Sequence, residues 1–173
     1  MPGIILLMSL LSCAFANVLH YEQEFLTFYD VKKNITKKGF KFTSIETDNK
    51  AQTLKVESTE TDEKMHFIAK VSNLIRKTNS GWILIDLQHK ENPPIKLKSS
   101  DKNWPIQNYS YSFKHNPETT HHISVERMFS KMRAKVDVHD WKGILSGTIE
   151  IEGKHIHEAD FLSRIRNITS VAQ

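Results

Sequence analysis

Cysteine is nearly absent from the sequence, which contains one, Cys13, among 173 residues. Cys13 lies in an apolar N-terminal stretch, and the chain after residue 16 has no cysteine. This excludes internal disulfides, thiol nucleophiles and cysteine-based zinc sites from that part of the chain. The remaining chain of about 157 residues can bury roughly 70% of its unfolded surface, which is enough for one self-sufficient core. We therefore expect a single β-rich domain over residues 17–173.

Charged side chains are missing from residues 1–16, MPGIILLMSLLSCAFA. This stretch ends in AFA (14–16), small residues at the positions that signal peptidase reads. It is too short to cross a bilayer of about 30 Å as a stable anchor. A retained membrane helix is one alternative. A bacterial lipoprotein signal, which LLSC (10–13) loosely resembles, is another, although no Lys or Arg precedes the apolar run. We predict a signal peptide over residues 1–16, cleavage before Asn17, secretion, and no stable membrane span.

Sequences for N-linked glycosylation occur three times, at Asn34-Ile-Thr36, Asn108-Tyr-Ser110 and Asn167-Ile-Thr169. Each is weak evidence alone. Together they fit a secreted glycoprotein that carries sugars on the surface at Asn34, Asn108 and Asn167.

The motifs of several enzyme classes are also missing. There is no GxSxG, no P-loop, no GxGxxG and no HExxH. The acidic residues are scattered, and no pair of them can be argued into one site. We predict that the protein is not an enzyme and uses no cofactor. A hydrolase would require the fold to assemble a Ser/His/Asp or His/Asp site from distant segments.

Histidine is abundant, with nine in the chain. His155 and His157 would share one face of a strand, a spacing that a zinc site can use. The candidates for a third ligand are His139, Asp140, His121 and His122. Nothing in the sequence indicates that these segments meet, so we expect surface or capping histidines and no metal.

The formal net charge is +4, and the 24 basic residues are dispersed among 20 acidic ones. The only dense basic cluster is Lys32, Lys33, Lys37 and Lys38. No basic stripe with interleaved aromatic residues is present, so we expect no nucleic-acid partner.

Alternation of apolar and polar residues with period two predicts strands over most of the chain. Turn residues punctuate these strands, among them Asn92-Pro93-Pro94, which exclude a central strand at that point. The segments recur every ten to fifteen residues, as in a sandwich or barrel. The predicted strands are 19–29, 40–47, 52–59, 63–75, 81–88, 95–98, 108–114, 121–126 and 134–141.

Helical spacing is present in two segments. Residues 126–135 carry Met128, Phe129 and Met132 at helical positions, which predicts one short internal helix. Residues 157–171 predict a C-terminal amphipathic helix, with acidic side chains early and basic ones late, as suits the helix dipole. For residues 139–153, two glycines and the alternation of Ile149 and Ile151 favour strand through most of the segment, with a closing or edge strand from Gly147. The expected fold class is mainly β, an antiparallel barrel or strongly curved sheet with these two helices.

A set of large apolar residues could enclose or cover an apolar ligand, although each could equally pack within an ordinary core. They are Trp82, Ile83, Leu84, Ile85, Phe25, Phe28, Phe40, Phe42 and Phe67.

The order of these features resembles the N-terminal β-barrel domain of the large lipid transfer proteins, which include the vitellogenins and the microsomal triglyceride transfer protein. The segments that carry the resemblance are HYEQEFLTF (20–28), FIAKVSNLIRKTNSGWILIDLQ (67–88), YSFKHNPETTHHISVE (111–126) and DWKGILSGTIEI (140–151). The string KGILS (142–146) is its most specific part. The likeness spans nearly the whole chain after residue 16, but only one domain of those larger proteins.

The resemblance implies a standalone domain that takes part in lipid binding or transport, or that docks to a lipoprotein-type partner or receptor. The alternative from the residues is a barrel of lipocalin type that encloses a small hydrophobic ligand. A helix threading a closed barrel would favour the first interpretation. A cavity that opens at one end of the barrel would favour the second.

Overall fold

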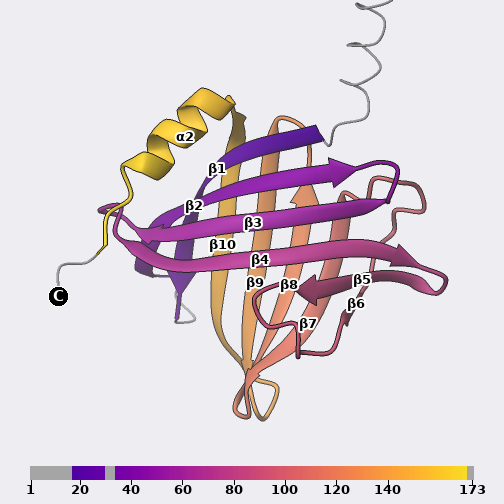
Figure 1. Ribbon diagram of the computed structural model, residues 1–173. Helices are drawn as coiled ribbons and strands as arrows, with labels where there is room; N and C mark the ends of the chain where they lie inside the picture. Colours follow the sequence, from indigo (N-terminus) through magenta and orange to yellow (C-terminus); the bar gives the residue numbers. More distant parts are fainter. Residues whose placement is uncertain (1–16, 30–33, 171–173) are drawn as a thin grey trace, which may run out of the picture.

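A single sheet that curls into a nearly closed barrel dominates the structure (Figure 1). The computed structural model describes residues 17–29 and 34–170. Within these residues, the elements are β1 (Asn17–Phe28), β2 (Ile35–Asp48), β3 (Thr53–Asp62), β4 (Phe67–Thr78), β5 (Gly81–Asp86), β6 (Ile95–Leu97), β7 (Asn108–Asn116), β8 (Thr119–Arg127), β9 (Lys131–Asp140), β10 (Leu145–Ile156) and α2 (Glu158–Arg166). Each segment predicted as a strand lies largely within one of these strands. The signal-peptide prediction for residues 1–16 lies outside the described residues.

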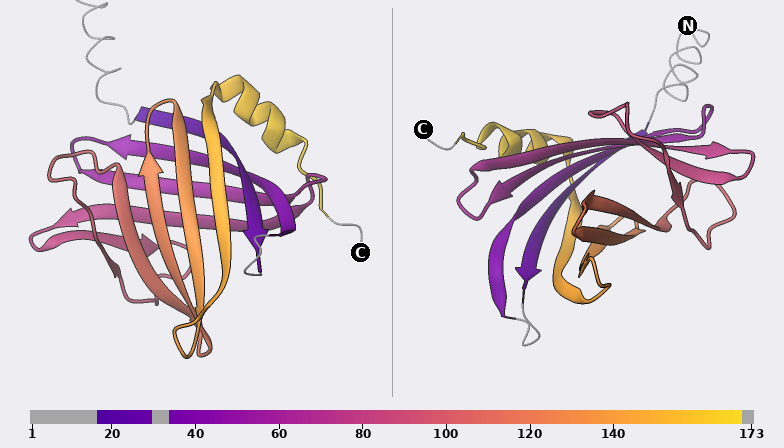
Figure 2. Two further views of the ribbon diagram at one scale, coloured as in Figure 1. Left: turned by 180° about the vertical axis from the view of Figure 1, so that it is seen from behind. Right: turned by 90° about the horizontal axis from the view of Figure 1, so that it is seen from below.

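The strand order is β6-β5-β4-β3-β2-β1-β10-β9-β8-β7, and all neighbouring strands are antiparallel. The chain runs up and down from β1 to β6, crosses to β7, and returns strand by strand until β10 pairs with β1. In Figure 1, β2 to β5 run across the view and β7 to β10 run steeply, so the two halves of the sheet lie over one another. Figure 2 shows the same arrangement from behind and from below.

One end of the barrel is filled by the hydrophobic core and by the connection between β6 and β7. Ile106 of this connection is fully buried, and its carbonyl accepts a hydrogen bond from Arg127 Nη2 at 2.9 Å. Trp104 stacks on Trp82 with ring centroids 5.6 Å apart, and its indole N–H donates to Asn49 Oδ1 in the β2–β3 turn. The core cluster at this end consists of Tyr21, Ile45, Leu54, Ile75, Trp82, Leu84, Leu97, Ile106, Tyr109 and Met132.

The predicted internal helix over residues 126–135 is wrong, because this segment is the hairpin between β8 and β9. The backbone N–H of Met128 donates to the carbonyl of Lys131 and closes a tight turn at Phe129. After the turn, Met132, Ala134 and Val136 alternate into the barrel, where all three line its cavity. Met128 and Met132 are four positions apart, a spacing that fits one face of a helix. It fits equally well two residues that lie on either side of the β8–β9 turn. Pairing with β8 and β10 then decides for the strand.

The segment 139–153 is strand on both sides of a turn, as predicted for most of its length. Asp140 ends β9, and its carboxylate accepts hydrogen bonds from the backbone N–H groups of Lys142 and Ile144. Gly143 has φ +81, a conformation that glycine adopts without strain. From Leu145 the chain forms β10, which closes the sheet between β9 and β1 and is not an edge strand.

Helix α2 packs on the outer surface of the barrel rather than threading it (Figures 1 and 2). The predicted C-terminal helix is confirmed, and it spans Glu158–Arg166 rather than the whole of residues 157–171. Phe161 stacks on His20 with ring centroids 4.3 Å apart. Arg164 Nε donates to Glu22 Oε1 at 2.6 Å, and its guanidinium lies 5.4 Å from the ring centroids of both Phe40 and Phe42. These contacts cover the outer face of β1 and β2.

His20 is expected to make the folded state sensitive to acid. Burial lowers the pKa of His20 below its ordinary value of 6.5 and His155 acts in the same direction, while the charge of Glu158 opposes this shift. Because the neutral imidazole is favoured in the fold, the unfolded chain binds more protons as the pH falls below 6.5, and stability decreases through that window. His20→Phe is expected to reduce this loss, as measured by urea unfolding at neutral and mildly acidic pH. An unchanged pH dependence in the variant would contradict the assignment.

Candidate ligand-binding cavity

A cavity of about 930 Å³ occupies the barrel between the filled end and the opposite end. It is lined by inward side chains from all ten strands and extends to the end of the barrel at which β1, β5 and β7 end. Tyr29, His89, Asn92, Lys114 and His115 line it there. Within the described residues, the cavity therefore reaches the end of the barrel that the core leaves unfilled.

The wall formed by β7 to β10 is mainly apolar. Tyr109, Tyr111 and Phe113 follow one another on the inner face of β7, with successive ring centroids 6.4 Å apart. Burial raises the pKa of Tyr111 to about 12 and raises that of Tyr109 as well. Both phenols therefore remain protonated and able to donate. The aliphatic side chains beside them are Ile123, Val125, Met132, Ala134, Val136, Ile149 and Ile151.

The facing wall on β1, β2 and β3 carries a buried polar network. Thr43 Oγ1 donates to Gln23 Oε1 at 2.8 Å and lies 2.9 Å from Ser58 Oγ, while Gln23 Nε2 donates to the carbonyl of Met132 at 3.3 Å. Gln23, Thr43 and Ser58 are all buried. Because each polar group finds a partner, the network costs little to bury and ties β1, β2, β3 and β9 together.

Lys41 and Glu60 lie beside this network and point into the cavity. Their register places them opposite one another on β2 and β3, with Nζ 3.9 Å from Oε1. Burial lowers the pKa of Lys41, and the charge of Glu60 partly offsets this. The pair gives the cavity a polar centre with no net charge.

Of the nine apolar residues proposed from the sequence to enclose a ligand, Phe25 and Leu84 line the cavity. Trp82 belongs to the core at the filled end. Phe40 and Phe42 lie outside, under Arg164. The other residues are Ile83, Ile85, Phe28 and Phe67, none of which lines the cavity. Two features were not predicted from the sequence, the row of Tyr109, Tyr111 and Phe113 on β7 and the Lys41–Glu60 pair. The alternation of NYSYSFK does, however, place these three aromatic rings on one face.

The fold keeps His155 and His157 apart from the histidines considered as a third ligand. Of these, His122 and His139 do meet, with ring centroids 4.6 Å apart. His155 lies near the filled end, against Tyr21 and Phe129. His139 lies near the opposite end, and His121 and His122 point to opposite faces of β8 because they are adjacent in one strand. Within residues 17–29 and 34–170, no group of three or more His, Cys, Asp or Glu side chains could hold a metal ion.

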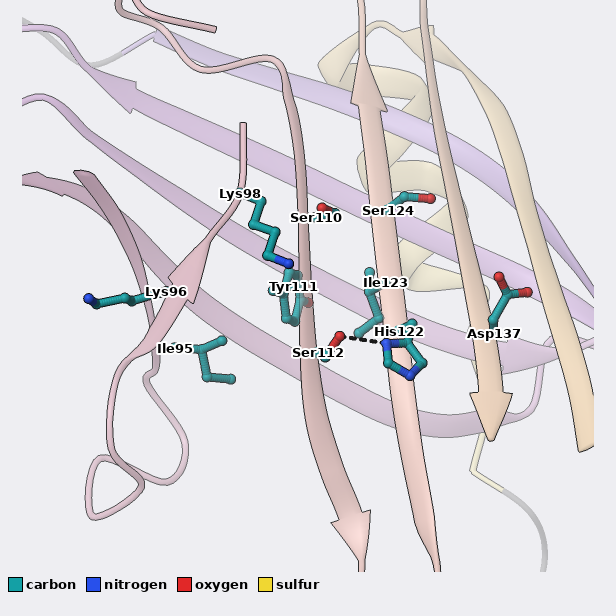
Figure 3. Close-up of a pocket in the computed structure, with 10 residues that line it drawn as sticks. All are labelled: Ile95, Lys96, Lys98, Ser110, Tyr111, Ser112, His122, Ile123, Ser124 and Asp137. Atoms are coloured by element: carbon teal, nitrogen blue, oxygen red, sulfur yellow. Dashed lines mark hydrogen bonds between the residues drawn. The ribbon is translucent and has the colours of Figure 1, made fainter. Parts of the chain in front are cut away.

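A serine, a histidine and an aspartate lie on neighbouring strands of the outer face of β7, β8 and β9 (Figure 3). Ser112 Oγ lies 2.6 Å from His122 Nδ1, and Asp137 is opposite His122 in the ladder. The Asp137 carboxylate, however, accepts a hydrogen bond from Thr148 Oγ1 at 3.0 Å and pairs with Lys135 at 3.8 Å. A catalytic triad requires the acid to orient the imidazole, and here the carboxylate is directed elsewhere.

The three predicted glycosylation sites lie at exposed positions. Asn34 precedes β2, Asn108 begins β7 and Asn167 follows α2. None of the three asparagines lines the cavity. None of the helices in the described part of the chain is both long and apolar enough to span a membrane.

No protein-family model matches the chain, and no curated protein matches it. Among solved structures, the chain is similar to the dehydratase domain from the CurJ module of the Curacin polyketide synthase. That likeness has 9% sequence identity and a TM-score of 0.23, and covers 93% of this chain and 83% of that chain. It is too weak to support any conclusion about activity.

Proposed function

We propose that the protein is a secreted, non-enzymatic glycoprotein that carries an apolar or amphipathic small molecule inside its barrel. The observation that carries this proposal is the cavity of about 930 Å³, in whose lining apolar side chains outnumber polar ones. Binding sites for small molecules typically have this size and composition.

The position of α2 bears on which of the two sequence interpretations to prefer. A helix threading the barrel would favour a domain like that of the large lipid transfer proteins, whereas α2 lies outside. The cavity that extends to one end of the barrel supports the alternative, a ligand-enclosing barrel of lipocalin type. Docking to a lipoprotein-type partner remains the prediction that follows from the resemblance.

The test is native mass spectrometry of the protein secreted from eukaryotic cells, with extraction and identification of bound lipid. We expect a reproducible bound mass in the wild type. Ala134→Trp/Val136→Trp, which fills the cavity from β9, is expected to lower occupancy about tenfold or more. The matched control is Arg133→Trp/Lys135→Trp, on the outer face of the same strand, and it should retain the bound mass.

A clean apo mass, together with no uptake of an added apolar fluorescent probe such as N-phenyl-1-naphthylamine, would reject the proposal. Equal binding by the inward and outward variants would also reject it, because the ligand would then lie elsewhere. The same spectra, taken after enzymatic removal of N-glycans, check cleavage before Asn17 and modification at Asn34, Asn108 and Asn167.

A further inference from the structure

The barrel wall is incomplete between β6 and β7. Strand β6 has three residues, and one bridge joins it to β7, in which Lys98 and Ser110 exchange two backbone hydrogen bonds of 2.8 Å. The opposite seam is different, since β1 and β10 pair continuously from His20 with Ile156 to Phe28 with Thr148. Beyond the Lys98–Ser110 bridge, no backbone ladder joins β6 to β7 in the described residues.

A second pocket, of about 520 Å³, lies at this incomplete seam (Figure 3). Three residues that line it, Ile95, Tyr111 and Ile123, also line the barrel cavity. The two spaces therefore share a wall at the gap between β6 and β7. The side chains of Ile95, Tyr111 and Ile123 thus stand between the cavity and the outer pocket.

The outer side of this gap is basic and rich in hydroxyl groups. Figure 3 shows the Lys98 side chain running from the end of β6 toward Tyr111, while Lys96 extends away from β7. Neither lysine takes part in an ion pair within the described residues. The acid among the lining residues, Asp137, is already engaged by Thr148 and Lys135. Hydroxyl and imidazole groups from Ser110, Ser112, Ser124 and His122 complete the lining.

Lys41, one of the lysines that line the cavity, is a poorer site for an anion than Lys98. Lys41 already faces the Glu60 carboxylate at 3.9 Å, so an anionic group brought to it would also meet a negative charge. Lys98 offers an ammonium group without such a partner, at a place where water can still reach a head group.

We propose that the ligand is an amphipathic anion, such as a fatty acid, whose chain lies in the cavity and whose head group binds Lys98 at the β6–β7 seam. The inference rests on the proposed function and names the class of molecule carried. Lys98 supplies the direct charge-assisted contact. Lys96 adds positive potential nearby, and the hydroxyl of Ser110 or Ser112 can donate to the same oxygen atoms.

The experiment compares binding of cis-parinaric acid and its methyl ester, which differ in charge at the head group. At neutral pH and low salt, we expect the wild type to bind the acid about tenfold more tightly than the ester, the scale of one charge-assisted hydrogen bond. Lys98→Glu is expected to abolish this preference while leaving ester binding within about twofold. Lys96→Glu should reduce the preference by less, because its side chain points away.

The matched control is Lys70→Glu on the outer face of β4, which makes the same change of net charge and should leave the preference intact. Equal wild-type affinity for acid and ester would overturn the inference and leave the proposed function standing. Loss of the preference in Lys41→Met but not in Lys98→Glu would also overturn it, by placing the head group inside the barrel. If the wild type bound neither probe, the proposed function itself would fail. Thermal unfolding of each variant excludes misfolding as the cause.

Discussion

Gly153→Ala is expected to destabilise the barrel by about 3 kcal/mol or more, the upper part of the range for overpacking a well-packed interior. Gly153 lies in β10, between Gln23 of β1 and Met132 of β9. A methyl group added there would overlap the carbonyl oxygen of Glu22 and the Cα atom of Gln23. Both are backbone atoms of β1, so no rotation of a side chain can relieve the overlap. The strands would have to separate.

The separation would also break the polar network, because the Gln23 side chain reaches across β10 at this position to the Met132 carbonyl. Urea unfolding followed by tryptophan fluorescence and circular dichroism measures the effect. Gly147→Ala in the same strand is the matched control, since its nearest neighbours would be the Phe28 carbonyl oxygen at 3.0 Å and a Tyr29 ring carbon at 3.1 Å. It should cost about 1 kcal/mol or less. Similar losses in both variants would contradict the close approach at Gly153.

Most of the strands could be predicted from the sequence, because period-two alternation is a local signal that each strand carries by itself. Residues 108–114 illustrate this, with Tyr109, Tyr111 and Phe113 on one face and Ser110 and Ser112 on the other. The internal helix was wrong because Met128 and Met132 satisfy a helical spacing and a hairpin equally well. Only pairing with neighbouring strands separates the two, and pairing is a property of the whole sheet.

The cavity could be predicted in kind but not in detail. Alternation defines two faces of each strand without indicating which one points into the barrel. Lys41 and Glu60 are 19 positions apart, and they meet only because the β2–β3 turn sets the register of the hairpin. The β6–β7 seam could not be predicted either, because its position depends on where the two edge strands of the curled sheet meet.

Strand β2 shows most clearly that alternation alone does not indicate which face of a strand points into the barrel. Phe40 and Phe42 share one face, and Lys41 and Thr43 share the other. The usual preference for buried aromatic residues would place the phenylalanines inside the barrel. They lie outside instead, and the polar face with Lys41 lines the cavity. The outer aromatic face is stable in this position because α2 covers it.

Phe42→Ala is therefore expected to cost about 3 to 4 kcal/mol, although Phe42 does not line the cavity. Its side chain is 1% exposed, and Arg164 of α2 lies over its ring while bonding to Glu22. Truncation would leave a void between the helix and the sheet and would weaken the docking of α2. Urea unfolding measures the loss, and limited proteolysis within Glu158–Arg166 reports release of the helix.

Phe40→Ala provides the control two positions along the same face. Phe40 also contacts Arg164 but is only partly buried, so its truncation should cost about 1 kcal/mol and leave α2 protected. Neither substitution changes a side chain that lines the cavity, so binding of an apolar probe to the folded fraction should be unaffected in both variants. Equal losses of stability for the two phenylalanines would mean that α2 does not seal the sheet at Phe42. A loss of probe binding in folded Phe42→Ala would mean that the outer face of β2 helps to shape the cavity.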